Sequence, residues 1–106
     1  MYTLKIYVKS DTGEAHKTGG FIRDAKTGRK IPKDPAALIG TTAEHHFAVA
    51  PGTYYYEFSS FEKTGTLSIV VSRTDTDPAT MIPVDPASHD ITKDGQHART
   101  AHFTIP

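Results

Sequence analysis

Six histidines stand in this chain of 106 residues, and histidine both binds metals and transfers protons near neutral pH. A strand brings two ligands together most simply when they are two residues apart, because alternate side chains share a face. His45 and His46 are adjacent, and His97 and His102 are five apart, so each pair is predicted to point to opposite faces of a regular strand. The weak candidates for a metal site are His89, His97 and His102, with Asp90 as a further ligand. We expect neither a resident metal nor another cofactor.

Nucleophilic catalysis needs a hydroxyl or thiol beside a histidine that a carboxylate orients. Ser88, His89 and Asp90 have these residue types but are contiguous, and a triad normally converges from separate elements. The sequence has no nucleophile-elbow motif and no glycine-rich phosphate loop. Residues 90–95 only faintly resemble a calcium loop and are better explained as an Asp-Gly turn. The chain is therefore predicted not to be an enzyme.

Aromatic residues suggest a contact surface instead. In the run of three tyrosines, Tyr54 and Tyr56 are predicted to point inward, which leaves Tyr55 outward beside Glu57. Tyr7 falls on the polar side of the first alternating segment. If the strands that carry Tyr7 and Tyr55 share a sheet, then Tyr7, Tyr55 and Glu57 form one exposed interaction surface, and aromatic residues are favoured at interfaces.

A second candidate surface lies in residues 73–97, which contain three prolines and five aspartates. We predict a long loop here, in which any strand is short or at a sheet edge, because proline cannot donate to a ladder. The residues of this loop proposed for contacts are Asp75, Asp77, His89 and Asp90.

Strands must position all of these side chains. Apolar and polar residues alternate with period two over residues 2–9, 54–59, 67–72 and 101–105. Weaker strands are expected at 20–24, 37–42 and 45–49, and one short helical turn at 33–37. Glycine-containing turns separate them. The sequence predicts one all-β domain over residues 1–106, an antiparallel β-sandwich of about seven strands.

Composition narrows the partners. Twelve basic and twelve acidic residues cancel, and the cluster Arg23, Lys26, Arg29, Lys30, Lys33 is diluted by Asp24 and Asp34, so we expect no nucleic-acid partner. No apolar run reaches the ~18 residues of a spanning helix, so no membrane span is expected. The first residues do not form an ordinary secretory signal, which favours cytoplasmic synthesis or a virion. Cysteine is absent, so disulfides and thiolate chemistry are excluded.

Two segments resemble known domains. Residues 20–32 resemble the opening of carboxypeptidase-regulatory-like domains, with a strand, an acidic residue, a Thr-Gly turn and an apolar-proline step. Residues 46–56 are similar to the Phe-x-Val-x-x-Pro-Gly-Thr-Tyr hairpin of the same domains. The resemblance implies a transthyretin-like (prealbumin-like) sandwich, with an immunoglobulin-like one as the alternative, and a spacer or adhesive role. Transthyretin-like hydrolases end in Tyr-Arg-Gly-Ser, whereas this chain ends in residues 102–106, His-Phe-Thr-Ile-Pro.

The expected function is a non-enzymatic structural or interaction domain, a homo-oligomer or a protein-binding subunit of a larger assembly such as a virion decoration or tail protein. Two alternatives stay open. One is a monomeric binding module or inhibitor that acts through residues 73–97. The other is a metal-binding or hydrolytic protein that uses the loop histidines.

Overall fold

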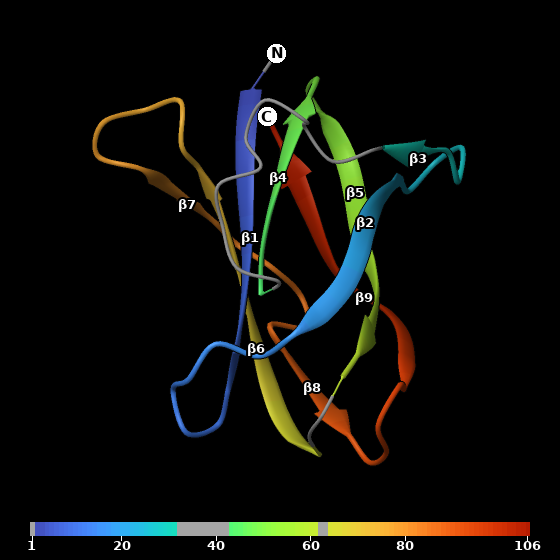
Figure 1. Cartoon of the computed structure of the whole chain (residues 1–106). Coiled ribbons are helices and arrows are strands. Elements are labelled where there is room, and N and C mark those ends of the chain that lie inside the picture. The colour runs from blue at the N-terminus through green and yellow to red at the C-terminus, as the bar shows by residue number, and fades with distance from the viewer. Residues whose placement is uncertain (1, 32–42, 62–63) are drawn as a thin grey trace.

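The computed structural model describes residues 2–31, 43–61 and 64–106, and these form two antiparallel sheets packed face to face (Figure 1). The prediction of an all-β sandwich is thereby confirmed. The described strands are β1 (Tyr2–Ser10), β2 (Thr18–Asp24), β3 (Lys30–Ile31), β4 (Glu44–Val49), β5 (Gly52–Ser60), β6 (Gly65–Arg73), β7 (Thr80–Ile82), β8 (Ser88–Ile91) and β9 (His97–Ile105). The strand expected at 37–42 and the turn expected at 33–37 lie outside the described residues. Nothing among those residues is a helix long and apolar enough to span a membrane.

The first sheet has the order β4-β1-β6-β7, and β8 also pairs with β6. The second sheet has the order β3-β2-β5-β9. Every described pairing is antiparallel; β1 and β6 form the centre of the first sheet, β2 and β5 form the centre of the second, and β9 is an edge strand. The tight turn at Pro51-Gly52 joins β4 to β5, so this connection crosses from one sheet to the other.

The core follows from the alternation seen in the sequence. The longer strands bury alternate side chains against the facing sheet, which is the arrangement expected of a sandwich. The largest fully buried side chains are Tyr56, Phe47, Phe58, Leu4, Ile6, Ile22, Leu67, Ile105, Val8, Val49, Val71 and Thr18. They come from both sheets, so one continuous core holds the sheets together.

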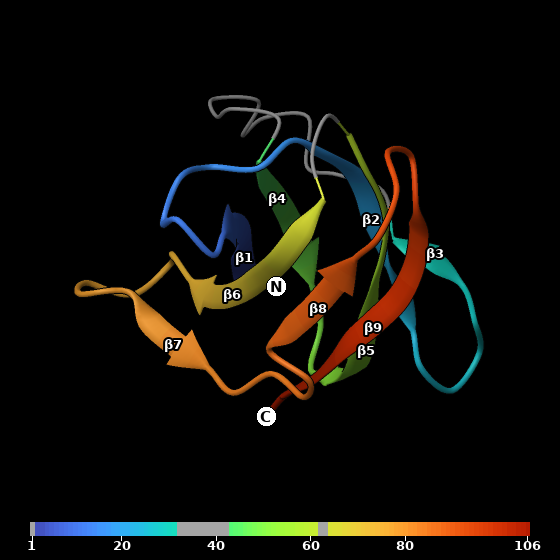
Figure 2. The same ribbon diagram turned by 90° about the horizontal axis from the view of Figure 1, so that it is seen from below.

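The region expected to be a long loop is more ordered than predicted. β7 and β8 both pair with β6, one after the other along the same edge, so together they form one interrupted edge strand. The interruption at residues 83–87 leaves the first sheet and reaches β9 of the second (Figure 2). There Asp85 and His102 exchange two backbone hydrogen bonds of 3.0 and 2.9 Å. Prolines 83 and 86 explain the interruption, because neither can donate to the β6 ladder. The prediction that strands here are short and at an edge is confirmed.

An irregularity in β9 changes which side chains share a face. Between Tyr55 and Tyr56 the register with β5 shifts, and Ala101 is the extra residue, with φ of 59°. Left-handed φ is uncommon for alanine and is typical of a bulge. His102 pairs with Tyr55 and His97 pairs with Ser59, so both histidines point to the outer side of the second sheet. The prediction that His97 and His102 diverge is therefore wrong, because it assumed a regular strand.

Candidate functional site

Glu57 is a buried carboxylate on the outer side of the second sheet. Its side chain is only 4% exposed, although neighbouring outward residues of β5 are half-buried. Arg23 on β2 holds Glu57 through a contact of 3.4 Å from Nε to Oε2. Arg99 on β9 places its Nε 2.5 Å from Oε1, and His97 Nε2 lies 3.7 Å from the same atom. Among the described residues none donates an aligned hydrogen bond to Oε1, so charge attraction dominates at that oxygen.

The bulge in β9 creates this cluster. Continuing the register of His102 with Tyr55 would place Thr100 opposite Glu57, whereas the extra residue Ala101 places Arg99 there. A directly opposite pair on one face has Cβ atoms about 5 Å apart, close enough for an ion pair. The strained backbone at Ala101 thus has a chemical consequence at Glu57.

Aromatic side chains surround the carboxylate. Phe21 pairs with Glu57 across β2 and β5, so it lies on the same outer side. The guanidinium of Arg23 lies 5.1 Å from the centre of the Phe21 ring, and Lys30 Nζ lies 4.3 Å from it. Tyr55 packs against His102 with ring centres 5.4 Å apart. We call the outward residues Phe21, Arg23, Lys30, Tyr55 and Arg99, which surround Glu57, the basic face.

Asp24 supports the turn from which Lys30 enters this face. Its Oδ1 accepts hydrogen bonds of 2.8 Å from the Lys26 N–H and 3.0 Å from the Thr27 N–H. These bonds, the one from Thr27 foremost, hold the pKa of the Asp24 carboxyl below its ordinary value. The β2–β3 turn is therefore closed by its own aspartate, and its basic side chains point away from the core.

The predicted surface of Tyr7, Tyr55 and Glu57 is not formed as one unit. Tyr7 lies on β1 in the first sheet, whereas Tyr55 and Glu57 lie on β5 in the second. Outward residues of the two sheets point away from each other, so Tyr7 belongs to the opposite side of the molecule. Glu57 was expected to be exposed but is covered by Arg23 and Arg99.

The inner side of the same sheet carries a different polar cluster. The Tyr56 hydroxyl and Thr18 Oγ1 are 2.9 Å apart, and His45 Nε2 lies 3.0 Å from the Thr18 carbonyl oxygen. His16 Nε2 lies 2.7 Å from Ser60 Oγ. Burial raises the pKa of the Tyr56 hydroxyl above its ordinary value, although the hydrogen bond with Thr18 acts against the increase. These groups join the two sheets and face the core, away from a partner.

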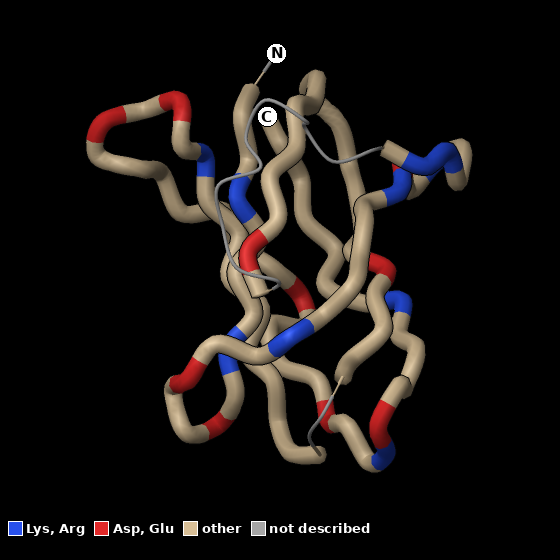
Figure 3. Tube along the Cα trace, in the orientation of Figure 1, with Lys and Arg blue, Asp and Glu red and all other residues tan. Residues whose placement is uncertain are grey.

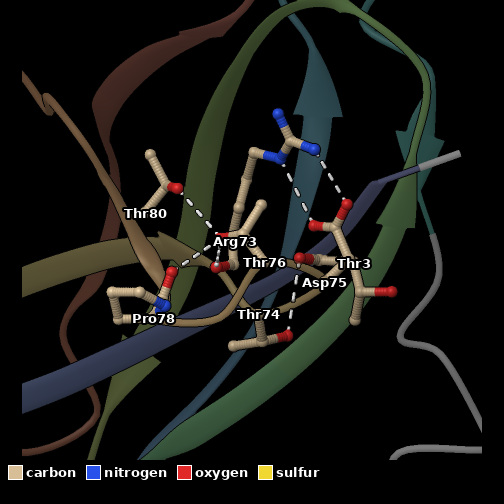
Figure 4. A network of polar contacts seen from close by, with 7 residues as sticks. All are labelled: Thr3, Arg73, Thr74, Asp75, Thr76, Pro78 and Thr80. Carbon is tan, nitrogen blue, oxygen red and sulfur yellow. Dashed lines mark hydrogen bonds and ion pairs between the residues drawn. The ribbon is translucent and has the colours of Figure 1, made fainter.

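The contact residues proposed in 73–97 lie in two separate places. Asp75 and Asp77 belong to the loop between β6 and β7, where Arg73 donates two hydrogen bonds of 3.3 and 2.8 Å to Asp75 (Figure 4). That contact lowers the pKa of the Asp75 carboxyl. His89 and Asp90 lie on β8, at the other end of β6. The structure therefore does not bring the four residues together.

The metal candidates do not converge either. His89 packs edge-on against Phe58, with ring centres 6.0 Å apart, on the inner side of β8. Asp90 accepts a hydrogen bond of 2.9 Å from Thr66. His97 and His102 share a face but lie opposite Ser59 and Tyr55, about 13 Å apart along the strand. Within 2–31, 43–61 and 64–106, no three histidine or acidic side chains are placed to hold a metal ion.

A shallow cavity of about 320 Å³ lies where residues 83–85 meet β9, and one of its lining residues, His102, packs against Tyr55 of the basic face. Its lining residues are Thr53, Pro83, Val84, Asp85, His102, Phe103 and Thr104. Thr53 and Thr104 come from paired positions of β5 and β9, with their hydroxyls 3.2 Å apart. The outer side of the second sheet is therefore uneven at this end.

Sequence reasoning missed Arg23, Arg99 and Phe21 as functional candidates. Alternation alone places Phe21 and Arg23 outward on β2, so a signal was available for these two residues. No such signal exists for Arg99 opposite Glu57, because strand partners and bulges cannot be read from alternation.

Comparisons with protein families, with curated proteins and with solved structures found no match for this chain. The resemblance to carboxypeptidase-regulatory-like and transthyretin-like domains therefore stays a prediction. Function has to be argued from the chain's own surface.

Proposed function

We propose that this chain is a non-enzymatic interaction domain, a subunit or accessory of a larger assembly, and that the basic face is its contact surface. The observation that carries the proposal is the buried Glu57 carboxylate, held under Arg23 and Arg99 on the outer side of a sheet. The facing sheet lies against the other side of β5, so among the residues that the structure describes Glu57 is covered by side chains of its own sheet.

A carboxylate removed from water costs several kcal/mol unless cations compensate it. Glu57 therefore restricts both guanidinium groups near their observed positions. Binding a partner then costs less conformational entropy, because part of the ordering is already present. Arginine and tyrosine are also the residue types most enriched at the energetic centres of interfaces, and this face offers Arg23, Arg99 and Tyr55.

The charge of the basic face indicates the sign of its partner. Arg23, Lys30 and Arg99 carry three positive charges, whereas the Glu57 carboxylate that they surround is buried. The Arg99 side chain remains 65% exposed. Complementary potentials favour an acidic partner surface. The neutral overall charge and the small extent of the face favour an acidic protein segment over nucleic acid.

Nuclear magnetic resonance titration of the labelled protein with a hexaglutamate peptide tests the proposal. We expect the largest amide shift changes at β2, β3 and the middle of β5 and β9, and weaker changes with hexalysine. Shift changes that are absent, or that centre on the outer side of β1 and β4, would overturn the assignment of this face.

The expectation of a virion component stays a prediction, because no described contact bears on it. The alternative that residues 73–97 act as a binding loop is favoured by one observation only. Its first part is an exposed loop with two aspartates that internal hydrogen bonds hold in place.

A further inference from the structure

Charge is distributed unevenly over the molecule. Residues 18–31 contain four basic residues and one acid, whereas residues 73–96 contain five aspartates and only Arg73 and Lys93. The basic β2–β3 turn and the acidic loop between β6 and β7 lie on opposite sides of the sandwich (Figure 3). The chain therefore carries two surfaces of opposite sign that are too far apart to meet within one copy.

The acidic surface has a defined shape. It comprises Asp75 and Asp77 in the loop after β6, together with Met81 on β7, and we call it the acidic hairpin. Asp75 is paired with Arg73 at 2.8 Å, so the negative charge that the hairpin offers to another molecule is that of Asp77. Thr76 Oγ1 fixes the loop: it lies 3.0 Å from the Pro78 carbonyl oxygen and 2.9 Å from Thr80 Oγ1 (Figure 4). The Thr74 N–H donates to the Thr3 carbonyl oxygen over 2.9 Å, which ties the loop to β1.

Met81 gives the acidic hairpin an apolar contact residue. It is 61% exposed, more than the other large apolar side chain found exposed among the described residues, Phe61 at 44%. Methionine sulfur packs favourably against aromatic rings, and the basic face offers Phe21 and Tyr55. The Asp77 carboxylate with a methionine on one surface is thus matched by cations with aromatic rings on the other.

We infer that the acidic hairpin of one copy docks on the basic face of a second copy. This inference rests on the proposed function, because it uses the same face and names its partner. The two surfaces differ, so the contact is heterologous and generates a ring or an open filament rather than a two-fold dimer. Both surfaces are held in place by internal contacts, which reduces the entropy lost on docking.

Two double variants test the contributions of the acidic hairpin and the basic face separately. Asp77→Asn with Met81→Thr weakens the acidic hairpin while keeping the Arg73–Asp75 contact and the Thr76 hydrogen bonds. Lys30→Gln with Arg99→Gln weakens the basic face. Lys9→Gln with Asp11→Asn is the control, because it removes one charge of each sign from the end of β1 and the turn that follows it, away from both surfaces.

Light scattering coupled to size exclusion, over a range of protein concentrations, measures association at ionic strengths of about 0.01 M and 0.5 M. Wild type and the control are expected to associate at low salt and to dissociate at high salt. Each variant pair is expected to raise the dissociation constant about tenfold or more. An equimolar mixture of the two variants retains one intact acidic hairpin and one intact basic face, so it is expected to stop at a dimer.

A wild type that stays monomeric at the highest concentration would overturn the inference. Equal association of wild type and both variants would do so as well. If the Arg99 change unfolds the chain, Lys30→Gln alone replaces it, with circular dichroism as the check. If the protein is strictly monomeric but binds hexaglutamate at the basic face, the self-assembly inference is rejected and the proposed function stands. If the protein neither self-associates nor binds hexaglutamate, both the inference and the proposed function are rejected.

Discussion

Tyr56 and Glu57 are neighbours on β5 and are both buried, yet they lie on opposite sides of the second sheet. Tyr56 is covered by the facing sheet, stacks on Phe58 at 4.8 Å and shares a neutral hydrogen bond with Thr18. Glu57 is covered by two arginines of its own sheet and forms ion pairs with both of them. The two residues are thus buried for different reasons: Tyr56 is packed between the sheets, whereas Glu57 is enclosed by long cationic side chains.

The difference separates a structural site from a surface site. The inner cluster has no route to a partner, because the first sheet occupies that side. The outer cluster ends in arginine side chains that can exchange contacts with water for contacts with another protein. Tyr56 and Glu57 cannot be distinguished by their burial. They differ in the groups that cover them, and this difference separates their roles.

The largest effect that tests this contrast is expected from two adjacent glycines of β2. A Cβ on Gly20 would lie 2.6 Å from the Tyr56 ring and hydroxyl, whereas one on Gly19 would lie 3.2 Å from the ring of the exposed Phe61. Gly20→Ala is expected to cost about 2–3 kcal/mol, because a buried ring stacked on Phe58 must move. Gly19→Ala is expected to cost less than about 1 kcal/mol. Urea unfolding measures both, and equal losses would show that the inner side is not tightly packed.

Glu57→Gln is expected to lower the free energy of unfolding by about 1–2 kcal/mol. The change leaves two guanidinium groups without their shared counter-charge, and their partial exposure reduces the loss below that of a fully buried pair. Glu44 on the opposite outer side is the matched control, since it lies 3.9 Å from Lys5 and 3.2 Å from His46 but is more exposed. Glu44→Gln should change stability by less than about 0.5 kcal/mol. A similar loss for both would mean that Glu57 is an ordinary surface ion pair.

Tyr56→Phe is expected to lower stability by about 1 kcal/mol at neutral pH, because the hydrogen bond with Thr18 is lost. Burial raises the pKa of Tyr56 in the folded state above its unfolded value of about 10. Ionisation of Tyr56 therefore leaves the free energy of unfolding unchanged below pH ~10, and above that pH it lowers the free energy of unfolding by up to about 1.4 kcal/mol per pH unit until the folded-state pKa is reached. Thermal melts from pH 7 to 12 should show a shallower alkaline decline for Tyr56→Phe than for wild type. Parallel declines would show that Tyr56 ionises freely.

Much of the fold was predictable because alternation reports directly which side chains face the core. The strands at 2–9, 20–24, 45–49, 54–59, 67–72 and 101–105 all lie within observed strands. The site was less predictable because it depends on pairing between distant strands. A single surface of Tyr7 and Tyr55 requires that their strands share a sheet, and alternation cannot test that condition. The bulge at Ala101 was invisible in the sequence, since alanine gives no signal for positive φ, and the bulge decides that Arg99 faces Glu57.

The most direct test of the account compares hexaglutamate binding by two variants that each remove one positive charge from an outer side. Arg99→Gln changes the second sheet, and Lys5→Gln changes the first. Isothermal calorimetry at low ionic strength is expected to give a dissociation constant about tenfold higher for Arg99→Gln than for wild type, and a nearly unchanged constant for Lys5→Gln. Equal weakening by both variants would mean that the peptide senses only overall charge, and it would contradict a contact surface organised around Glu57.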